Sequence, residues 1–285
     1  MLLHRVCLFR GGSGGVLFCA ARNRHGGKDD ERPLHLRHAA NGSSQSAAGH
    51  PLLCCAPVKN RRRVYLVRHG EVSYFEPGRD PGDHDPALTQ AGVAQARALG
   101  QLLAEAPIDL AVCTGLRRTE QTARLAIAGR DLPIGTIEGL SEAKTGSFEG
   151  IESFAEMEAL VTRAFDHAEE PDARFLTGES YSALWDRVAA AWAGLLGRSD
   201  WTCAFVACHG VVNRTILAQA LGTGPQIYRR IEQDPGCVNV LDIEGEGPNA
   251  RVDYVRLMNF TPYNAAKEGM LETTLETLWR QFTAD

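Results

Sequence analysis

The sequence has few of the features that mark membrane proteins or zinc proteins. None of the apolar runs in its 285 residues approaches the length that a membrane-spanning helix needs. Its eight cysteines include no CxxC pair, so we expect no structural zinc site. Four of them lie among apolar residues after position 112, as is typical of free thiols in a reducing compartment. We therefore expect a cytoplasmic protein with no membrane partner.

Positive charge is scarce outside the beginning of the chain. Residues 1–63 contain eleven Lys/Arg and three Asp/Glu, a net charge of +8. The remainder contains nineteen Lys/Arg and thirty-two Asp/Glu, a net charge of −13, and the two parts add to the −5 of the whole chain. Because an acidic remainder argues against a surface for nucleic acid, we expect no nucleic-acid partner. The sequence does not indicate the oligomeric state.

Residues 1–62 lack the apolar pattern of a folded domain. Glycine and serine are concentrated at 11–15 and 41–49, and such a composition cannot bury enough apolar surface to fold alone. The apolar stretch at 16–21 is too short for a signal peptide. Residues 1–28 contain five Arg/Lys and no acid, as organellar presequences do. We expect a disordered or targeting-like tail, and organellar import is the alternative to a cytoplasmic location.

The stretch that organises the rest of the chain begins at Val64. Residues 64–67 are all aliphatic or aromatic, which favours a central strand of a parallel sheet. Arg68, His69 and Gly70 follow directly. Ligands of open α/β sheets bind just beyond the carboxyl ends of the strands, so we expect Arg68 and His69 in a site. A guanidinium suits phosphate or carboxylate, and an imidazole can attack, carry a proton or bind a metal.

Residues 72–86 contain three Pro and two Gly, and predict a loop over this site. Tyr74, Phe75 and Arg79 lie in this loop. They could contact a substrate or pack within the loop, and the sequence does not decide between these roles.

A second unit of helix, strand and helix follows the loop. Thr89 predicts the N-cap of a helix that runs to about Ala106. Its core-facing side chains are expected to be Val93, Ala96, Leu99, Leu102 and Leu103. Residues 109–113 predict a strand, and a helix follows through Ala128. Arg118 lies in the first turn of that helix, where a cation is unfavourable unless an anion is bound nearby, so this junction indicates an anion site.

The remaining chain continues the alternation of strands and helices. We expect strands at 134–137, 203–208, 238–243 and 252–257, two or three helices within 151–197, a helix through Leu221 and a C-terminal amphipathic helix at 267–283. The strand at 203–208 ends in His209-Gly210, which repeats the pattern of the first stretch. We expect one domain at 63–260 and a C-terminal helical extension at 261–285.

Five short motifs occur in order between positions 68 and 210. They are Arg68-His69-Gly70, Thr114–Ala123, Leu140-Ser141-Glu142 followed by Gly146–Gly150, Gly178-Glu179-Ser180, and His209-Gly210. Any one of them is weak, whereas five in order at sensible spacing are specific. On these motifs the chain resembles the histidine phosphatase superfamily over about residues 62–260, as a phosphoglycerate-mutase-like phosphatase of the branch 1 type. The resemblance implies an α/β fold, a three-layer α/β/α sandwich with a mostly parallel central sheet and a helical insertion.

The resemblance also implies a role for each charged residue. His69 would be the nucleophile that forms a phosphohistidine, and Glu142 would protonate the leaving oxygen and then activate water. Arg68, Arg118 and His209 would hold the phosphoryl oxygens and offset the transferring charge. Because these cations supply the positive charge that a metal would otherwise give, we expect no metal and no other cofactor.

The expected function is hydrolysis of a small phosphate ester of a metabolite. A phosphoglycerate-type mutase of the same fold is the first alternative, and a non-catalytic protein that binds a phosphorylated ligand is the second. Family mutases carry a Trp-Asn signature and a Phe-x-Gly-Trp stretch in this loop, and residues 72–86 contain neither, which favours water as the acceptor. Val72 and Thr114 stand where the family usually has Thr and Ser, and Ser73 could replace the missing hydroxyl. The sequence does not identify the ester.

Overall fold

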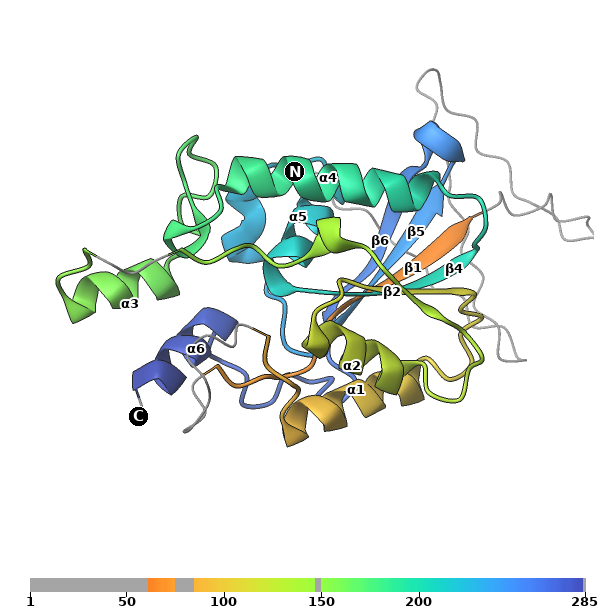
Figure 1. The fold of residues 1–285 in the computed structure, drawn as a ribbon, viewed down its shortest axis with the longest axis horizontal. Coiled ribbons are helices and arrows are strands. Elements are labelled where there is room, and N and C mark those ends of the chain that lie inside the picture. The colour runs from red at the N-terminus through yellow and green to blue at the C-terminus, as the bar shows by residue number, and fades with distance from the viewer. Residues whose placement is uncertain (1–60, 75–84, 147–149, 284–285) are drawn as a thin grey trace, which may run out of the picture. The chain divides into compact units, whose positions relative to one another are not determined.

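Six strands form one sheet in the computed structural model, which describes residues 61–74, 85–146 and 150–283. The strand order is β3-β2-β4-β1-β5-β6 (Figure 1). The bounds are β1 Arg62–Arg68, β2 Leu110–Cys113, β3 Ile134–Thr136, β4 Cys203–Cys208, β5 Val238–Glu244 and β6 Arg251–Phe260. The first four strands pair in parallel, and β5 and β6 add to β1 in antiparallel pairs. The expectation of a mostly parallel sheet is confirmed, with β1 and β4 at its centre.

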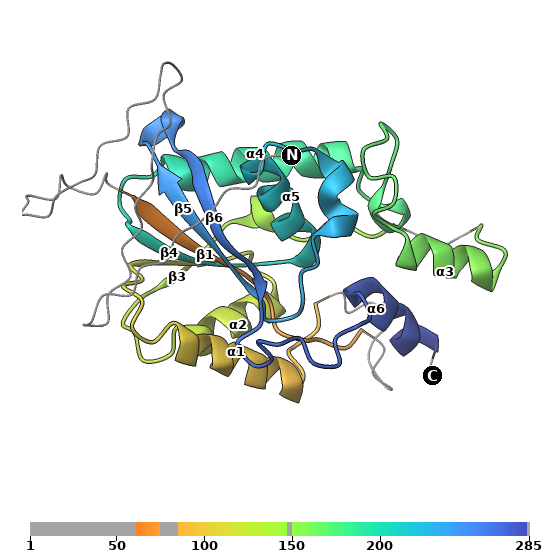
Figure 2. The same ribbon diagram turned by 180° about the vertical axis from the view of Figure 1, so that it is seen from behind.

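Helices cover both faces of this sheet (Figures 1 and 2). Helices α1 (Gln90–Leu102) and α2 (Arg117–Ala126) lie on one face, and α4 (Tyr181–Gly197) and α5 (Gly210–Ala220) lie on the other. Successive side chains of a strand point to opposite faces, so Leu66 of β1 packs in the core under α4 and α5, while Val67 packs under α1 and α2. The three-layer arrangement expected from the sequence is confirmed.

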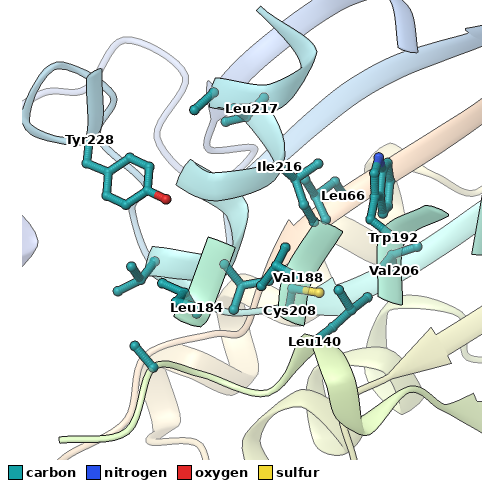
Figure 3. Packing of buried hydrophobic residues seen from close by; sticks show 14 of the residues in the cluster. Leu66, Leu140, Leu184, Val188, Trp192, Val206, Cys208, Ile216, Leu217 and Tyr228 are labelled. Carbon is teal, nitrogen blue, oxygen red and sulfur yellow. The ribbon is translucent and has the colours of Figure 1, made fainter. Parts of the chain in front are cut away.

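The larger core cluster fixes the two central strands. Leu66 and Val206 come from β1 and β4 and pack in one cluster with Val188 of α4 and Ile216 of α5 (Figure 3). Each large apolar side chain buried in this way contributes roughly 1.5–3 kcal/mol to stability. Since β1 and β4 end at His69 and His209, this packing also fixes the positions of both histidines.

The helical insertion and the C-terminal helix are present with adjusted bounds. Helix α3 (Phe154–Thr162) lies in the insertion, and α6 (Thr274–Thr283) begins seven residues later than position 267, where we expected it. Lys267 and Gly269 have φ angles of 58° and 72°, which a helix does not accommodate. Thr273 caps α6, because its hydroxyl accepts a hydrogen bond from the N–H of Glu276 at 3.2 Å. The described residues also form four short 3-10 helices: η1 Glu138–Leu140, η2 Phe175–Thr177, η3 Pro225–Arg230 and η4 Gly247–Asn249.

One expectation about the first helix is wrong. Leu102 does not face the core, because 47% of its surface is exposed, whereas Leu103 is buried. Helix α1 also ends earlier than expected, at Leu102 instead of at about Ala106, so Leu102 is its last residue and Leu103 is the C-cap. The chain then leaves the helix in turns, in which the N–H of Ala106 donates to the carbonyl oxygen of Leu103 at 3.0 Å.

The expected tail at 1–62 lies almost entirely outside the described residues. Arg62, its last residue, begins β1 and is buried, with its guanidinium 4.2 Å from the ring centre of Trp201. The division into a tail, a domain and a C-terminal extension stays a prediction. Among the helices of the described residues, none combines the length and the apolar character that crossing a membrane requires.

Candidate active site

The carboxyl ends of β1, β2 and β4 bring two histidines and a threonine together. His69 follows β1, Thr114 follows β2 and His209 follows β4, and the three strands are neighbours in the sheet. The ring centres of His69 and His209 are 5.3 Å apart in an edge-to-face arrangement. Thr114 Oγ1 lies 2.8 Å from Nε2 of His209. The two His-Gly pairs of the sequence thus form one cluster.

The protonation of His69 suits a nucleophile. Its Nδ1 lies 2.7 Å from the carbonyl oxygen of Gly70. A carbonyl can only accept, so Nδ1 carries the proton of the neutral ring and Nε2 carries the lone pair. Burial, followed by the charges of Arg118 and Arg68, holds the pKa of His69 well below its ordinary value of 6.5. At neutral pH the ring is therefore uncharged and its Nε2 can attack an electrophile.

The two arginines expected in the site flank the histidines and retain unused donors. Arg68 Nη1 donates to the carbonyl oxygen of Gln233 at 2.5 Å, and Arg118 Nη1 lies 3.2 Å from a carboxylate oxygen of Asp85. Within the described residues, Arg68 Nε, Arg118 Nε and His209 Nδ1 are buried and have no hydrogen-bond partner. A buried polar group without a partner costs roughly 1–3 kcal/mol. An oxyanion bound among these residues would supply the acceptors that both guanidinium groups lack, and His209 Nδ1 could donate to it once that nitrogen carries a proton.

Glu142 lies beside His209, at the start of α5. Its Oε2 accepts a hydrogen bond from the N–H of Val211 at 3.4 Å, and its Oε1 accepts one from Ala143 at 3.0 Å. Val211 is two residues beyond His209 in the first turn of α5. The carboxyl group expected from the sequence to exchange protons therefore reaches the cluster from the segment that follows η1.

An ion pair at the beginning of α4, between Arg187 and Glu179, holds the segment that carries Glu142 in place. Glu179, the residue before the Ser180 N-cap of α4, accepts two hydrogen bonds from Arg187, at 3.0 and 2.7 Å. Arg187 also donates to the carbonyl oxygens of Gly139 and Ser141, at 2.9 and 2.8 Å. Burial alone would raise the pKa of Glu179, but the hydrogen bonds and charge of Arg187 lower it. The Gly-Glu-Ser motif thus acts through Arg187 on the backbone on both sides of Leu140.

Sequence reasoning missed three contacts of this site. It did not predict that Thr114 would contact His209, although a hydroxyl directly after a strand is a signal that could have been used. It also missed Asp85, which accepts from the N–H of Arg117 at 2.8 Å and pairs with Arg118. The third is Arg214, which is buried on α5.

Arg214 pairs with the carboxylate of Glu232, which lies between η3 and β5 in the chain. Its Nη2 donates to Glu232 at 2.7 Å, and its guanidinium lies 4.7 Å from the ring centre of Phe165. Burial lowers the pKa of Arg214, an effect that the charge of Glu232 opposes. A position four residues into a buried helix gives no sequence signal for such a pair, because the partner lies far along the chain.

The expected loop contacts are mostly untested. Tyr74 is described and its surface is 39% exposed, whereas Phe75 and Arg79 lie outside the described residues. Phe148 of the glycine-rich motif also lies outside them. In the parts of the chain that the structure describes, no group of three or more His, Cys, Asp or Glu side chains could hold a metal ion.

Comparisons with known proteins place these features in a family. The family model of the histidine phosphatase superfamily (branch 1) matches residues 64–254. An adenosylcobalamin/alpha-ribazole phosphatase of Escherichia coli is 29% identical over 67% of this chain and 94% of its own length. The crystal structure of the alpha-ribazole phosphatase from Shigella flexneri is 27% identical and covers 69% of this chain and 96% of that chain, with a TM-score of 0.55.

A plant relative is longer than this chain. A probable 2-carboxy-D-arabinitol-1-phosphatase of Arabidopsis thaliana is 32% identical over 72% of this chain, and the match covers only 43% of the plant protein. This chain therefore spans less than half the length of that relative. Other matching relatives are named as phosphoglycerate mutases.

Proposed function

The chain belongs to the histidine phosphatase superfamily (branch 1), and we propose that it hydrolyses small phosphate monoesters through a phosphohistidine on His69. The observation that supports this most is the cluster itself. A neutral His69, whose Nε2 carries the lone pair, lies in one cluster with two buried guanidinium nitrogens that have no partner, on Arg68 and Arg118, and with the buried ring of His209. This combination offers a nucleophile together with the donors that a phosphoryl group requires.

In the first step, the lone pair of His69 Nε2 attacks phosphorus, and the bond between phosphorus and the ester oxygen breaks. The carboxyl of Glu142 gives its proton to that oxygen, so an alcohol leaves and a carboxylate remains. In the second step, the Glu142 carboxylate takes a proton from water, and the water oxygen attacks phosphorus. The bond between phosphorus and Nε2 breaks, its electron pair returns to the imidazole and inorganic phosphate leaves.

The charges around His69 explain how the transferring group is stabilised. Negative charge lies on the three equatorial oxygens of the phosphoryl group in both steps. Arg68 and Arg118 place two fixed positive charges beside it, and Arg118 is held in place by Asp85. Such preorganised charges in a buried site are worth more than in water, because no solvent has to reorganise. We expect activity in the presence of EDTA, since these residues supply the positive charge.

Trapping the intermediate tests the mechanism. The wild-type enzyme is quenched during turnover of a labelled ester, and the label should be found on His69 in a form that is stable in alkali and labile in acid. His69→Ala should abolish both the label and turnover, because the proposed nucleophile is gone. His167→Ala is the control, since that side chain is exposed and distant in the insertion. Label on a serine, or an active His69→Ala enzyme, would overturn the proposal.

The substrate is a small phosphate ester, and the relatives suggest where a screen should start. Alpha-ribazole phosphate and 2-carboxyarabinitol 1-phosphate follow from the names of two relatives. Incubation with 3-phosphoglycerate, with and without 2,3-bisphosphoglycerate, tests the mutase alternative. Rapid conversion to 2-phosphoglycerate with little free phosphate would favour the mutase, and tight ester binding without turnover would favour a binding protein. A cytoplasmic location, with organellar import as its alternative, remains part of the proposal.

A further inference from the structure

A chain of hydroxyl groups fixes the proton of His209. Thr119 Oγ1 lies 2.8 Å from the carbonyl oxygen of Leu116 and 3.0 Å from Thr114 Oγ1. The carbonyl can only accept, so the single proton of Thr119 is used there. We assign the proton of Thr114 to Thr119, whose oxygen also accepts from the backbone N–H of Thr114 at 3.3 Å. With this assignment, the oxygen of Thr114 accepts from Nε2 of His209, 2.8 Å away. Neutral His209 therefore carries its proton on Nε2.

This assignment determines what His209 can offer to a ligand. Its Nδ1 then carries a lone pair, and this atom is buried without a hydrogen-bond partner in the described part of the chain. A lone pair facing a phosphoryl oxygen is repulsive, because both atoms are acceptors. Nδ1 can donate to an oxyanion only when the ring has gained a second proton and become an imidazolium.

We propose that Thr114 is a positioning residue that fixes the Nε2–H form of His209, so that binding of an oxyanion takes up one proton on Nδ1. The proposal rests on the proposed function, since it assumes that the oxyanion binds in this cluster. His209 would then be neutral in the empty site and become a cation only when the phosphoryl group binds.

The charges that face His209 explain why the proton enters with the ligand. Burial is the largest cause that holds the pKa of His209 well below 6.5, and electrostatic interactions with Arg118, His69, Arg68 and Arg187 follow. Glu142 is the carboxylate on this side, at 3.4 Å from the N–H of Val211 in the first turn of α5. Cations from β1, α2 and α4 thus oppose an imidazolium in the empty site. A bound dianion offsets these charges and favours the protonated ring.

The pH dependence of sulfate binding tests the proposal. Sulfate remains a dianion over the pH range of the assay, so any proton taken up belongs to the protein. Its inhibition constant against p-nitrophenyl phosphate should rise about tenfold per pH unit between the pKa values of the free and the sulfate-bound enzyme, as expected for one linked proton. Inhibition that does not change with pH would overturn the proposal.

Two variants of Thr114 assign the proton linkage to this residue. Thr114→Val removes the acceptor for Nε2–H, so the neutral ring can carry its proton on Nδ1 and donate without proton uptake. The pH slope of sulfate inhibition should then flatten. Thr114→Ser keeps the hydroxyl and should keep the wild-type slope. A wild-type slope in Thr114→Val would overturn the role of Thr114.

Nitrogen NMR of the ¹⁵N-histidine-labelled wild-type protein provides a readout that needs neither activity nor a folded variant. In the free enzyme, Nδ1 of His209 should show the shift of an unprotonated nitrogen, and both ring nitrogens should be protonated with sulfate. A free enzyme with its proton on Nδ1 would overturn the proposal. Absence of both turnover and sulfate binding would instead refute the proposed function, so the two failures are distinguishable.

Discussion

Gly70 and Gly92 lie backbone against backbone where α1 meets the end of β1. A Cβ on Gly70 would be 2.5 Å from the carbonyl oxygen of Gly92, and a Cβ on Gly92 would be 2.2 Å from that of Glu71. Both distances are below 3.0 Å, which real Cβ atoms essentially never reach, and the opposing atoms belong to the backbone. Helix α1 can therefore approach the segment that carries His69 only because neither residue has a side chain.

Gly92→Ala is expected to destabilise the protein and to slow turnover. The added methyl must push α1 away from residues 70–71, and overpacking of this kind costs about 1–3 kcal/mol. Gly194→Ala is the matched control, because Gly194 lies inside α4 with open space around its Cβ position. There, the better helix propensity of alanine should stabilise by about 0.5–1 kcal/mol. Urea unfolding and kcat of both variants provide the measurement, and an unchanged Gly92→Ala enzyme would contradict the packing account.

The sheet and the positions of the charged residues could be predicted from the sequence, because each depends on a short local pattern. Residues 64–70 and 203–210 alone were enough to predict two buried strands that are each followed by His-Gly. The start of α6 could not be predicted, since its apolar spacing extends back across Lys267 and Gly269, whose positive φ angles depend on local turns.

The contacts between side chains of different elements could not be predicted from the sequence either. Thr114 and His209 are 95 positions apart, and Arg187 acts on carbonyls 46 and 48 positions before it. No periodicity relates such pairs, and only the packing of the layers brings them together. The motifs therefore indicated which residues belong to the site, while the partners that fix their protonation and orientation came from the structure.

Arg187→Lys is expected to impair the same step as loss of Glu142. Lysine keeps the charge but cannot bond Glu179 and the carbonyls of Gly139 and Ser141 together. The segment that carries Glu142 should loosen, and kcat for alkyl phosphates should fall by about tenfold or more, as expected when a few hydrogen bonds of about 1 kcal/mol each are lost. When Arg187→Lys is added to the Glu142→Gln variant, kcat for alkyl phosphates should not fall any further. Arg198→Lys, at an exposed ion pair with Asp200, is the control.

Additive losses in the Arg187→Lys, Glu142→Gln double variant would mean that Arg187 acts through something other than Glu142. The stability of the Arg187→Lys protein is measured separately by urea unfolding, so that a general loss of folding is not mistaken for a catalytic defect.

Glu142→Gln is expected to slow poor leaving groups selectively. General-acid catalysis contributes about 10²–10⁴-fold when the leaving oxygen needs a proton, and little when it is already a stable anion. Turnover of alkyl phosphates should therefore fall far more than turnover of p-nitrophenyl phosphate. Glu170→Gln, an exposed carboxylate in the insertion, is the control and should leave both rates unchanged. Equal losses on both substrates would show that Glu142 positions groups without donating a proton.

The stability of the free enzyme is expected to fall as the pH drops below neutral, because His69 and His209 are buried in neutral form. Their pKa values in the folded state lie well below 6.5, the ordinary value that the unfolded chain retains. Below pH 6.5 the unfolded state therefore binds protons that the folded state does not. The free energy of unfolding should fall by up to about 1.4 kcal/mol per pH unit for each of the two histidines, until the folded pKa is reached. Above pH 6.5 neither histidine contributes a slope.

Urea unfolding between pH 5.5 and 7.5 measures this slope, in a range above the titration of the paired carboxylates. His209→Gln should remove about half of it, because one of the two buried titrating groups is gone, while His167→Ala should leave it unchanged. Sulfate should reduce the slope as well, since a bound dianion favours the protonated form of His209 in the folded state. A stability that stays constant over this range would mean that the two histidines accept protons in the folded protein as readily as in the unfolded chain, and would contradict the neutral, nucleophilic His69 from which the mechanism starts.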